Sequence, residues 1–301
     1  MHSNLWVFPR GMKRNGETGE NSLEWTSRYG SVVTSAFEIA STDGMNEKGL
    51  VANLLWLPET EYPVRDKNKP GLAITAWVQY MLDNFATVEE AVAYIDEDTF
   101  QVVSDMMPDG SRLATLHLSI SDATGDCAIF EYIGGKLTVY HSKEYKVMTN
   151  SPTYNKQLAL SEYWKSIGGL SFLPGTNRAA DRFARASFYI NALPETDDER
   201  IAVASVFSVV RNASVPYGIS TPESPEISTT QWRTVSESKN LRYFFESSLT
   251  PNTFWVNLKD FDLSEGAPVF KLSIANGEMY HGNTAKNFKT ALPFKFMGVK
   301  G

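Results

Sequence analysis

The sequence predicts an α+β fold built from antiparallel sheets. Groups of strand patterns alternate with groups of helix patterns along its 301 residues, whereas a doubly wound parallel sheet would require strand and helix to alternate strictly. Apolar residues make up 42% of the chain, which is enough for a sizeable core. No repeat and no Pro-, Ser- or Gly-rich linker divides the chain, so we expect a single domain over residues 1–301.

The first third of the chain is predicted to form strands and then helices. Strand segments rich in β-branched and aromatic residues lie at 5–8, 31–37 and 50–56. Turns are expected at Asp43-Gly44 and Lys48-Gly49. Helix formers fill residues 74–85, and Thr87 with Glu90 forms a capping box that opens a second helix.

The rest of the chain is predicted to be a strand meander, a helical layer and a last group of strands. The meander covers residues 100–105, 114–122, 126–133 and 136–141 and continues at 145–149. Helical periodicity occupies 157–167 and 177–192, and a third helix begins at a Thr196 cap with Glu199. The closing strands are expected at 232–235, 241–246, 253–258 and 269–274.

Composition argues against several classes of partner. The formal charge of −7 comes without a cluster of Lys and Arg, so we expect no nucleic-acid partner. No apolar run approaches the roughly 18–20 residues that span a bilayer, and we expect no membrane association. The single cysteine, Cys127, excludes an internal disulfide and a site with several cysteine ligands, and Met1 begins no signal peptide.

Common catalytic signatures are absent from the sequence. We find no Gly-x-Ser-x-Gly elbow, P-loop, dinucleotide fingerprint or His-Glu-x-x-His zinc motif. His117 alternates with leucines in a strand pattern, so a structural role is expected, and we expect no metal. Cys127 has no neighbouring base or cation in its strand pattern, so we expect it to pack rather than to react.

Two polar residues, Asn150 and Arg182, are candidates for a functional site. Asn150 follows an apolar strand directly, which places an amide and backbone N–H groups at the end of a sheet, a geometry that stabilises an oxyanion. Taken alone, a turn before Pro152 is the simpler interpretation. Arg182 follows Asp181 early in a helix, where a solvated surface pair is the simpler interpretation.

Taken together, these segments resemble the choloylglycine hydrolase family, which comprises penicillin V acylases and bile salt hydrolases. The resemblance rests on short motifs in one order along the whole chain: NLWVFPRG at 4–11, VMTNSP at 147–152 and LPGTNRAADRF at 173–183. Trp56, where bile salt hydrolases hold an asparagine, is most similar to the Gram-negative penicillin V acylases. The short connection between residues 167 and 173 supports the same branch.

The resemblance implies a four-layer α/β/β/α sandwich, the N-terminal nucleophile hydrolase fold, and hydrolysis of a linear amide C–N bond without a cofactor. It implies that Asn150 and Arg182 are active-site residues: Asn150 supplies an oxyanion contact, and Arg182 orients the nucleophile or its carboxylate neighbour. Trp56 binds the small-molecule amide, through its indole N–H or as an apolar wall. Penicillin V, conjugated bile salts and acyl homoserine lactones remain open as substrates. A periplasmic homotetramer is also implied.

The nucleophile of this family is a cysteine at the first residue of the mature chain, whose α-amino group, with an ordinary pKa of about 8, acts as its base. The family pattern puts this cysteine before Asn4, so we expect the domain to be N-terminally incomplete and the 301 residues as written to be inactive. A catalytically dead relative that retains ligand binding is the alternative. Missing strands would expose core and strand edges, which favours the incomplete amidase.

Overall fold

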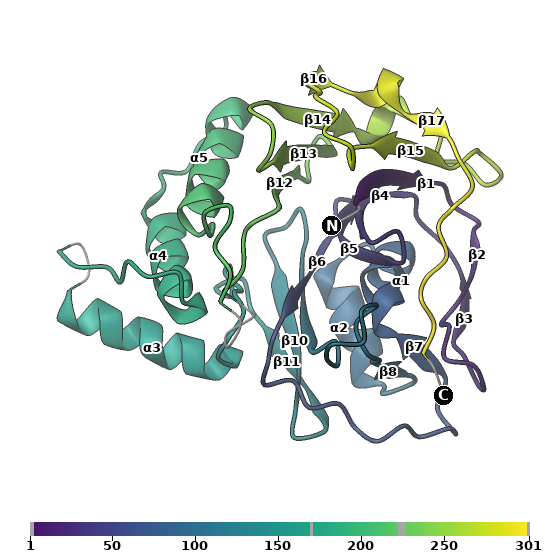
Figure 1. The fold of residues 1–301 in the computed structure, drawn as a ribbon, viewed down its shortest axis with the longest axis horizontal. Helices are drawn as coiled ribbons and strands as arrows, with labels where there is room; N and C mark the ends of the chain where they lie inside the picture. Colours follow the sequence, from purple (N-terminus) through teal and green to yellow (C-terminus); the bar gives the residue numbers. More distant parts are fainter. Residues whose placement is uncertain (1–2, 169–170, 222–226, 300–301) are drawn as a thin grey trace.

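The computed structural model describes residues 3–168, 171–221 and 227–299 and has four layers (Figure 1). A nine-stranded sheet and a four-stranded sheet pack face to face. Helices α1 (Trp77–Asn84) and α2 (Val88–Asp96) cover the outer face of the large sheet. Helix α5 (Glu199–Asn212) packs against the small sheet. The predicted α+β class and the α/β/β/α layers are confirmed.

All neighbouring strands of the large sheet are antiparallel. From edge to edge it contains β11 (Lys136–His141), β10 (Cys127–Ile133), β9 (Leu116–Ser121), β6 (Val51–Trp56), β5 (Ala40–Asn46), β4 (Ser31–Ala36), β1 (Asn4–Phe8), β15 (Phe270–Ser273) and β17 (Lys289–Thr290). Because side chains alternate along a strand, Leu5 and Val7 face the small sheet while Trp6 and Phe8 face the helices α1 and α2.

The small sheet has four strands among the described residues. Its order is β12 (Trp232–Glu237), β13 (Arg242–Ser247), β14 (Thr253–Asn257) and β16 (Gly282–Asn283), with β14 and β16 parallel. Two further pairs lie outside the main sheets: β2 (Lys13–Asn15) with β3 (Glu24–Thr26), and β7 (Gly71–Ala73) with β8 (Gln101–Val103). Short 3-10 turns occur at η1 (Ile74–Ala76), η2 (Leu258–Asp260) and η3 (Ala285–Asn287).

Two apolar cores hold the layers together. One lies between the large sheet and the helices and includes Trp77, Met81 and Phe130. The other lies between the two sheets and includes Met45 and Tyr243. Each fully buried side chain of this size contributes roughly 1.5–3 kcal/mol through burial.

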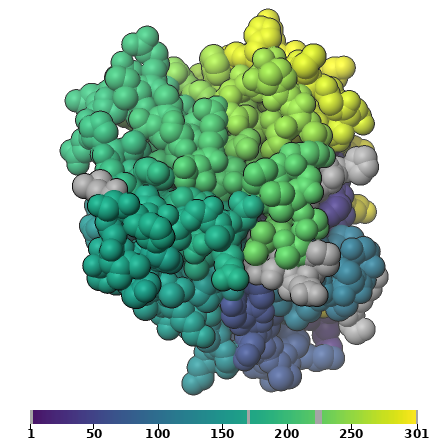
Figure 2. All heavy atoms as spheres, turned by 60° about the vertical axis from the view of Figure 1, so that its left-hand side comes forward, coloured from purple at the N-terminus to yellow at the C-terminus, as the bar shows by residue number. Residues whose placement is uncertain are grey.

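Helix α4 (Ala179–Ala192) packs against α5 on one side and against α3 (Tyr154–Ile167) on the other. Figure 2 shows their residues on one face of the molecule, next to the sandwich. Within the described ranges, no helix has both the length and the apolar content that a membrane crossing requires.

Several local predictions were wrong, each for a tertiary reason. Asp43-Gly44 lies inside β5, because the chain turns earlier, at Phe37 and Glu38, with φ values of 53° and 58°. Residues 145–149 form no strand, since Tyr145 and Val147 pack on Tyr154 instead of extending the sheet edge. The strand expected at 100–105 shortens to β8, whose parallel partner β7 was not predicted.

Helix starts were predicted with mixed success. The capping box of α2 is confirmed, because Thr87 Oγ1 accepts a hydrogen bond from Glu90 N at 3.2 Å. The cap expected at Thr196 is instead Asp198, whose Oδ1 accepts from Arg200 N at 2.9 Å. A carboxylate is a stronger acceptor at a helix N-terminus than a hydroxyl, which explains the shift of two residues.

Candidate active site

Three residues singled out in the sequence come together where β6 ends, Trp56 through its backbone carbonyl and Asn150 and Arg182 through their side chains. Asn150 Nδ2 donates to the carbonyl oxygen of Trp56 at 2.8 Å, and Asn150 Oδ1 accepts from Arg182 Nη2 at 2.8 Å. Arg182 Nε donates to the carbonyl of Asn177 at 3.0 Å. The amide of Asn150 therefore links the end of the large sheet to α4.

Arg182 lies in the first turns of α4 and is only 9% exposed. A buried guanidinium is stable only when its donors meet acceptors, and Asn150 and Asn177 supply two of them. The cation polarises the amide oxygen that it contacts, which makes the Asn150 N–H groups better donors. The surface-pair interpretation of Arg182 is thus wrong, because burial removes the arginine from solvent.

Trp56 presents its ring to an apolar cavity of about 180 Å³. Its walls are apolar side chains from β6, β9, the turn after β4 and the loop before β9, among them Leu54, Leu116, Phe37, Met107 and Ile74. The guanidinium carbon of Arg112 lies 4.9 Å from the centre of the indole ring. Trp56 Nε1 is buried and has no acceptor among the described residues. Of the two roles predicted for Trp56, this geometry favours the apolar wall.

The loop that carries Asn150 is held by residues that the sequence did not indicate. Ser151 Oγ donates to Glu59, which follows β6. The side chain of Gln157, in the first turn of α3, contacts the loop through several hydrogen bonds. Gln157 was predicted merely to begin a helix, and no local pattern marks it, because its contacts depend on how the preceding loop folds.

A buried carboxylate anchors the start of α3. Glu131 of β10 accepts hydrogen bonds from Tyr154 N at 3.1 and 2.9 Å, one to each carboxylate oxygen. His117 Nδ1 lies 3.0 Å from Glu131, as expected of a structural histidine. A negative charge at a helix N-terminus is favourable. The sequence signal for this cluster is a charged residue, Glu131, inside the apolar run 128–133.

Cys127 lies at the opposite end of the strands that carry the site. Across the ladder, Cys127 is opposite Ser121 and Ser121 is opposite Val51, five residues before Trp56. At about 3.4 Å per residue this separation is about 17 Å. Burial, followed by the nearby carboxylates of Asp126 and Asp122, raises the pKa of the Cys127 thiol to about 11. The expectation that Cys127 is unreactive agrees with this environment.

A groove of about 620 Å³ separates β12 from β5 and β6. Asp43 lies in its wall and accepts hydrogen bonds from Trp232 Nε1 and Thr234 Oγ1, both at 3.3 Å, and from Tyr243. Burial raises the pKa of Asp43 to about 6. Among the described residues, no group of three or more His, Cys, Asp or Glu side chains is placed to hold a metal ion.

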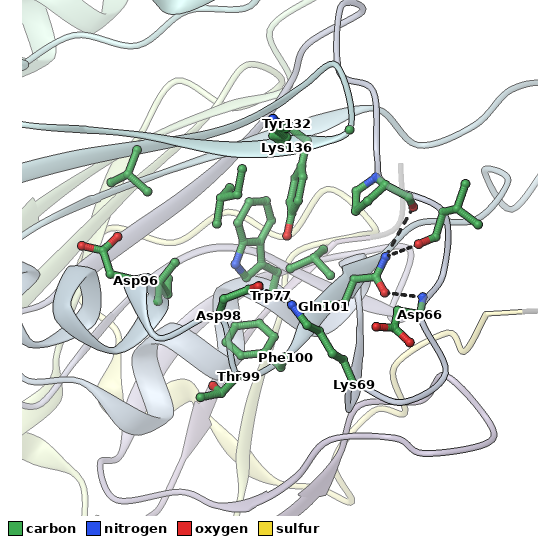
Figure 3. Close-up of a pocket in the computed structure, with 17 residues that line it drawn as sticks. Asp66, Lys69, Trp77, Asp96, Asp98, Thr99, Phe100, Gln101, Tyr132 and Lys136 are labelled. Carbon is green, nitrogen blue, oxygen red and sulfur yellow. Dashed lines mark hydrogen bonds and ion pairs between the residues drawn. The ribbon is translucent and has the colours of Figure 1, made fainter.

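Another cavity, of about 410 Å³, lies between β8, α2 and the β10–β11 hairpin (Figure 3). Trp77, Phe100 and Tyr132 contribute aromatic walls. The charges at its rim include an ion pair between Lys69 and Asp98. None of the three predicted site residues lines this cavity, so we place the chemistry at the end of β6 instead.

Comparisons with known proteins show the family of the chain. The family model for linear amide C–N hydrolases of the choloylglycine hydrolase family matches residues 1–271. The chain is 50% identical to a penicillin V acylase of Pectobacterium atrosepticum over 319 residues, covering 99% of this chain and 85% of that protein. It is 28% identical to a bile salt hydrolase/transferase of Clostridium perfringens, covering 72% of each.

Solved structures give the same result. The structure of penicillin V acylase from Agrobacterium tumefaciens superposes with a TM-score of 0.93 at 55% identity, covering 99% of this chain and 92% of that one. A variant of the conjugated bile acid hydrolase from Clostridium perfringens shares the fold, with a TM-score of 0.77 at 23% identity and coverage of 93% and 92%. The chain therefore belongs to the choloylglycine hydrolase family of linear amide C–N hydrolases.

Proposed function

We propose that this protein hydrolyses the amide bond between a compact aryl- or alkyl-acyl group and a polar amine, as in penicillin V. The observation that carries the proposal is the hydrogen-bonded chain from Trp56 through Asn150 to Arg182, set beside an apolar cavity. These hydrogen-bonded residues supply polarised donors for an oxyanion, and the cavity supplies an apolar pocket for the acyl group.

The proposed reaction is nucleophilic acyl transfer. A cysteine thiol loses its proton to the terminal amine and attacks the carbonyl carbon, forming a C–S bond and an oxyanion that the Asn150 donors stabilise. The C–N bond then breaks as the amine leaves with the proton. Water cleaves the thioester, which releases the carboxylic acid and regenerates the thiol. Arg182 keeps Asn150 in place during these steps, and no cofactor takes part.

Cavity size supports a compact acyl group. An apolar cavity of about 150 Å³ holds benzene, so the cavity of about 180 Å³ beside Trp56 suits one aromatic ring with a short linker. A sterol nucleus is several times larger and would lie largely outside it. We therefore prefer an acylase to the bile salt hydrolase alternative.

The nucleophile is proposed to lie outside these 301 residues. Cys127 is about 17 Å from the site, at about 3.4 Å per residue along the ladder, and its pKa of about 11 keeps the thiol protonated at neutral pH. The edge of β12 borders the groove next to β6, and both support entry of an extended segment there. A strand added to β12 would bring a terminal cysteine to the groove beside β6.

An activity assay tests this proposal. We expect the 301 residues as written to leave penicillin V intact, and the same chain preceded by a family hairpin that begins with cysteine to cleave it. A hairpin with serine in place of the cysteine serves as the control. Turnover by the chain as written that Cys127→Ala abolishes would reassign the nucleophile. A cysteine-bearing chain that folds but binds penicillin V without cleaving it would support the dead relative.

The proposal also covers the oligomeric state of the protein and its location in the cell. Helix α3 exposes Leu160, Tyr163 and Ile167 by 40%, 56% and 51%, and their spacing places them on one face. A face of this kind supports contact between copies of this chain in a homotetramer. Light scattering of Tyr163→Asp should give a smaller particle than the wild type. Fractionation of the native host tests the proposed periplasmic location.

A further inference from the structure

Three carbonyl groups of the Asn150 loop, those of Thr149, Asn150 and Pro152, turn toward one side chain. Gln157 is 1% exposed, and its Nε2 donates to the carbonyls of Asn150 at 2.9 Å and Pro152 at 2.6 Å. The same nitrogen lies 3.4 Å from the carbonyl of Thr149. Gln157 Oε1 accepts from Thr149 Oγ1 at 2.8 Å, which fixes the orientation of the amide.

This arrangement determines where the backbone N–H groups of the loop point. In a trans peptide, the C=O of one residue and the N–H of the next point in opposite directions. With the carbonyls of Thr149 and Asn150 directed at Gln157, the N–H groups of Asn150 and Ser151 point away from α3. Within the described residues, neither N–H donates a hydrogen bond. Two adjacent, unpaired N–H groups directed to the same side are suited to an oxyanion.

Gln157 is not needed to cap its own helix. The first N–H of α3, that of Tyr154, already donates to Glu131. A capping side chain accepts hydrogen bonds from helix N–H groups, whereas Gln157 donates into the loop before the helix. Its buried amide therefore acts on the peptide planes of the loop rather than on α3.

We propose that Gln157 is a positioning residue of the hydrolase, which holds the Asn150 and Ser151 N–H groups toward the oxyanion of the substrate. The inference rests on the amidase function proposed above and extends it, since it assigns the oxyanion contact to two backbone N–H groups under the control of one side chain. It adds Ser151 N–H to the contacts expected from Asn150.

The substitution Gln157→Glu tests the inference in the enzyme that carries its N-terminal cysteine. Glutamate has nearly the same shape, but it faces the loop carbonyls with oxygen instead of N–H, so the peptide planes must rotate. We expect kcat for penicillin V to fall about tenfold or more, with KM changed by less than about threefold, because the acyl cavity is untouched.

Gln101→Glu is the matched control. Gln101 is 7% exposed, its Nε2 donates to the carbonyls of Pro63 and Val64 at 3.4 and 3.0 Å, and its Oε1 accepts from Asp66 N (Figure 3). It holds another loop in the same way, away from Asn150. We expect Gln101→Glu to lower the unfolding temperature as Gln157→Glu does, but to keep kcat within about twofold of the wild type.

Each outcome separates the inference from the proposed function. A folded Gln157→Glu enzyme with wild-type kcat, or an equal loss of kcat in Gln101→Glu, overturns the positioning role. If Gln157→Glu does not fold, Thr149→Val removes the hydroxyl that orients the amide and should lower kcat about threefold. A wild-type enzyme that cleaves no amide contradicts the proposed function instead. In that case, crystal structures of the wild type and of Gln157→Glu test the positioning role without an activity assay. Thr149 and Asn150 carbonyls that keep their wild-type orientation in Gln157→Glu would overturn the inference.

Discussion

The two ends of the ladder formed by β6, β9 and β10 differ in the chemistry that they gather. At one end, the Trp56 carbonyl accepts a hydrogen bond from Asn150, which is bound in turn to Arg182. At the other end lies the one thiol of the chain, Cys127, opposite Ser121. The only thiol of the 301 residues and the polarised donors therefore lie at opposite ends of the same strands.

The difference in environment between the two ends supports the proposal that the chemistry takes place at the Trp56 end. At the Cys127 end, burial and two carboxylates raise the thiol pKa, so the reactive thiolate is scarce. At the Trp56 end, a buried cation polarises an amide, and a dry cavity lies alongside. In the proposed mechanism, a nucleophile delivered to the Trp56 end meets donors that are already in place.

The largest expected effect comes from Asn150→Ala at the Trp56 end. In the enzyme with its N-terminal cysteine, we expect kcat for penicillin V to fall about a hundredfold with a modest change in KM, as removal of an oxyanion donor does. Asn155→Ala, at an exposed position in the first turn of α3, serves as the control and should keep kcat within about twofold. An unchanged kcat in a folded Asn150→Ala protein would show that the Asn150 side chain does not stabilise the oxyanion and that only backbone N–H groups do.

Arg182→Lys should have the next largest effect. One ammonium group cannot reach both the Asn150 amide and the Asn177 carbonyl, which the guanidinium contacts through separate nitrogens. Loss of one hydrogen bond to a charged group costs ~2 kcal/mol, so kcat should fall about thirtyfold. Steady-state kinetics alongside thermal unfolding would test this, and a fall in stability with no fall in kcat would make Arg182 purely structural.

Trp56→Ala should change substrate choice more than overall rate. Loss of the apolar wall should reduce kcat/KM for penicillin V more than for a taurine-conjugated bile acid, by about tenfold, since one pocket contact is worth about 1–3 kcal/mol. Competition assays with both substrates measure this ratio directly. Equal losses on both would instead make Trp56 part of the shared transition-state contact, which would weaken the argument for an acylase.

Cys127→Ser should have the smallest effect, with kcat within about twofold of the wild type. The raised pKa gives a second test. At a pKa of about 11, about one thiol in a thousand is ionised at pH 8, so iodoacetamide should label Cys127 slowly and the rate should rise with pH up to about 11. Mass spectrometry of the labelled peptide follows the rate, and rapid labelling at pH 7 would contradict this environment.

Sequence patterns predicted the elements better than their edges. The aromatic and β-branched composition of 5–8 and the capping box at Thr87 are local signals, and the strand and the helix start that they predict are both confirmed. Asp43-Gly44 looked like a turn, but pairing with β4 and β6 holds it in a strand. Tyr145 and Val147 looked like a strand, but an aromatic cluster around Tyr154 removes them from the sheet edge. Contacts across the fold outweighed local preference in both cases.

The sequence by itself determined the fold class and the family and singled out Trp56, Asn150 and Arg182 as candidates, because composition, periodicity and ordered motifs are properties of neighbouring residues. Only the tertiary structure decided that these three form one hydrogen-bonded chain, that the Trp56 ring lines a cavity, and that Gln157 turns the carbonyls of the Asn150 loop. Hydrogen bonds depend on distances of about 3 Å and on direction. Residues 94 positions apart, such as Trp56 and Asn150, acquire that geometry only when the sheets and helices have packed.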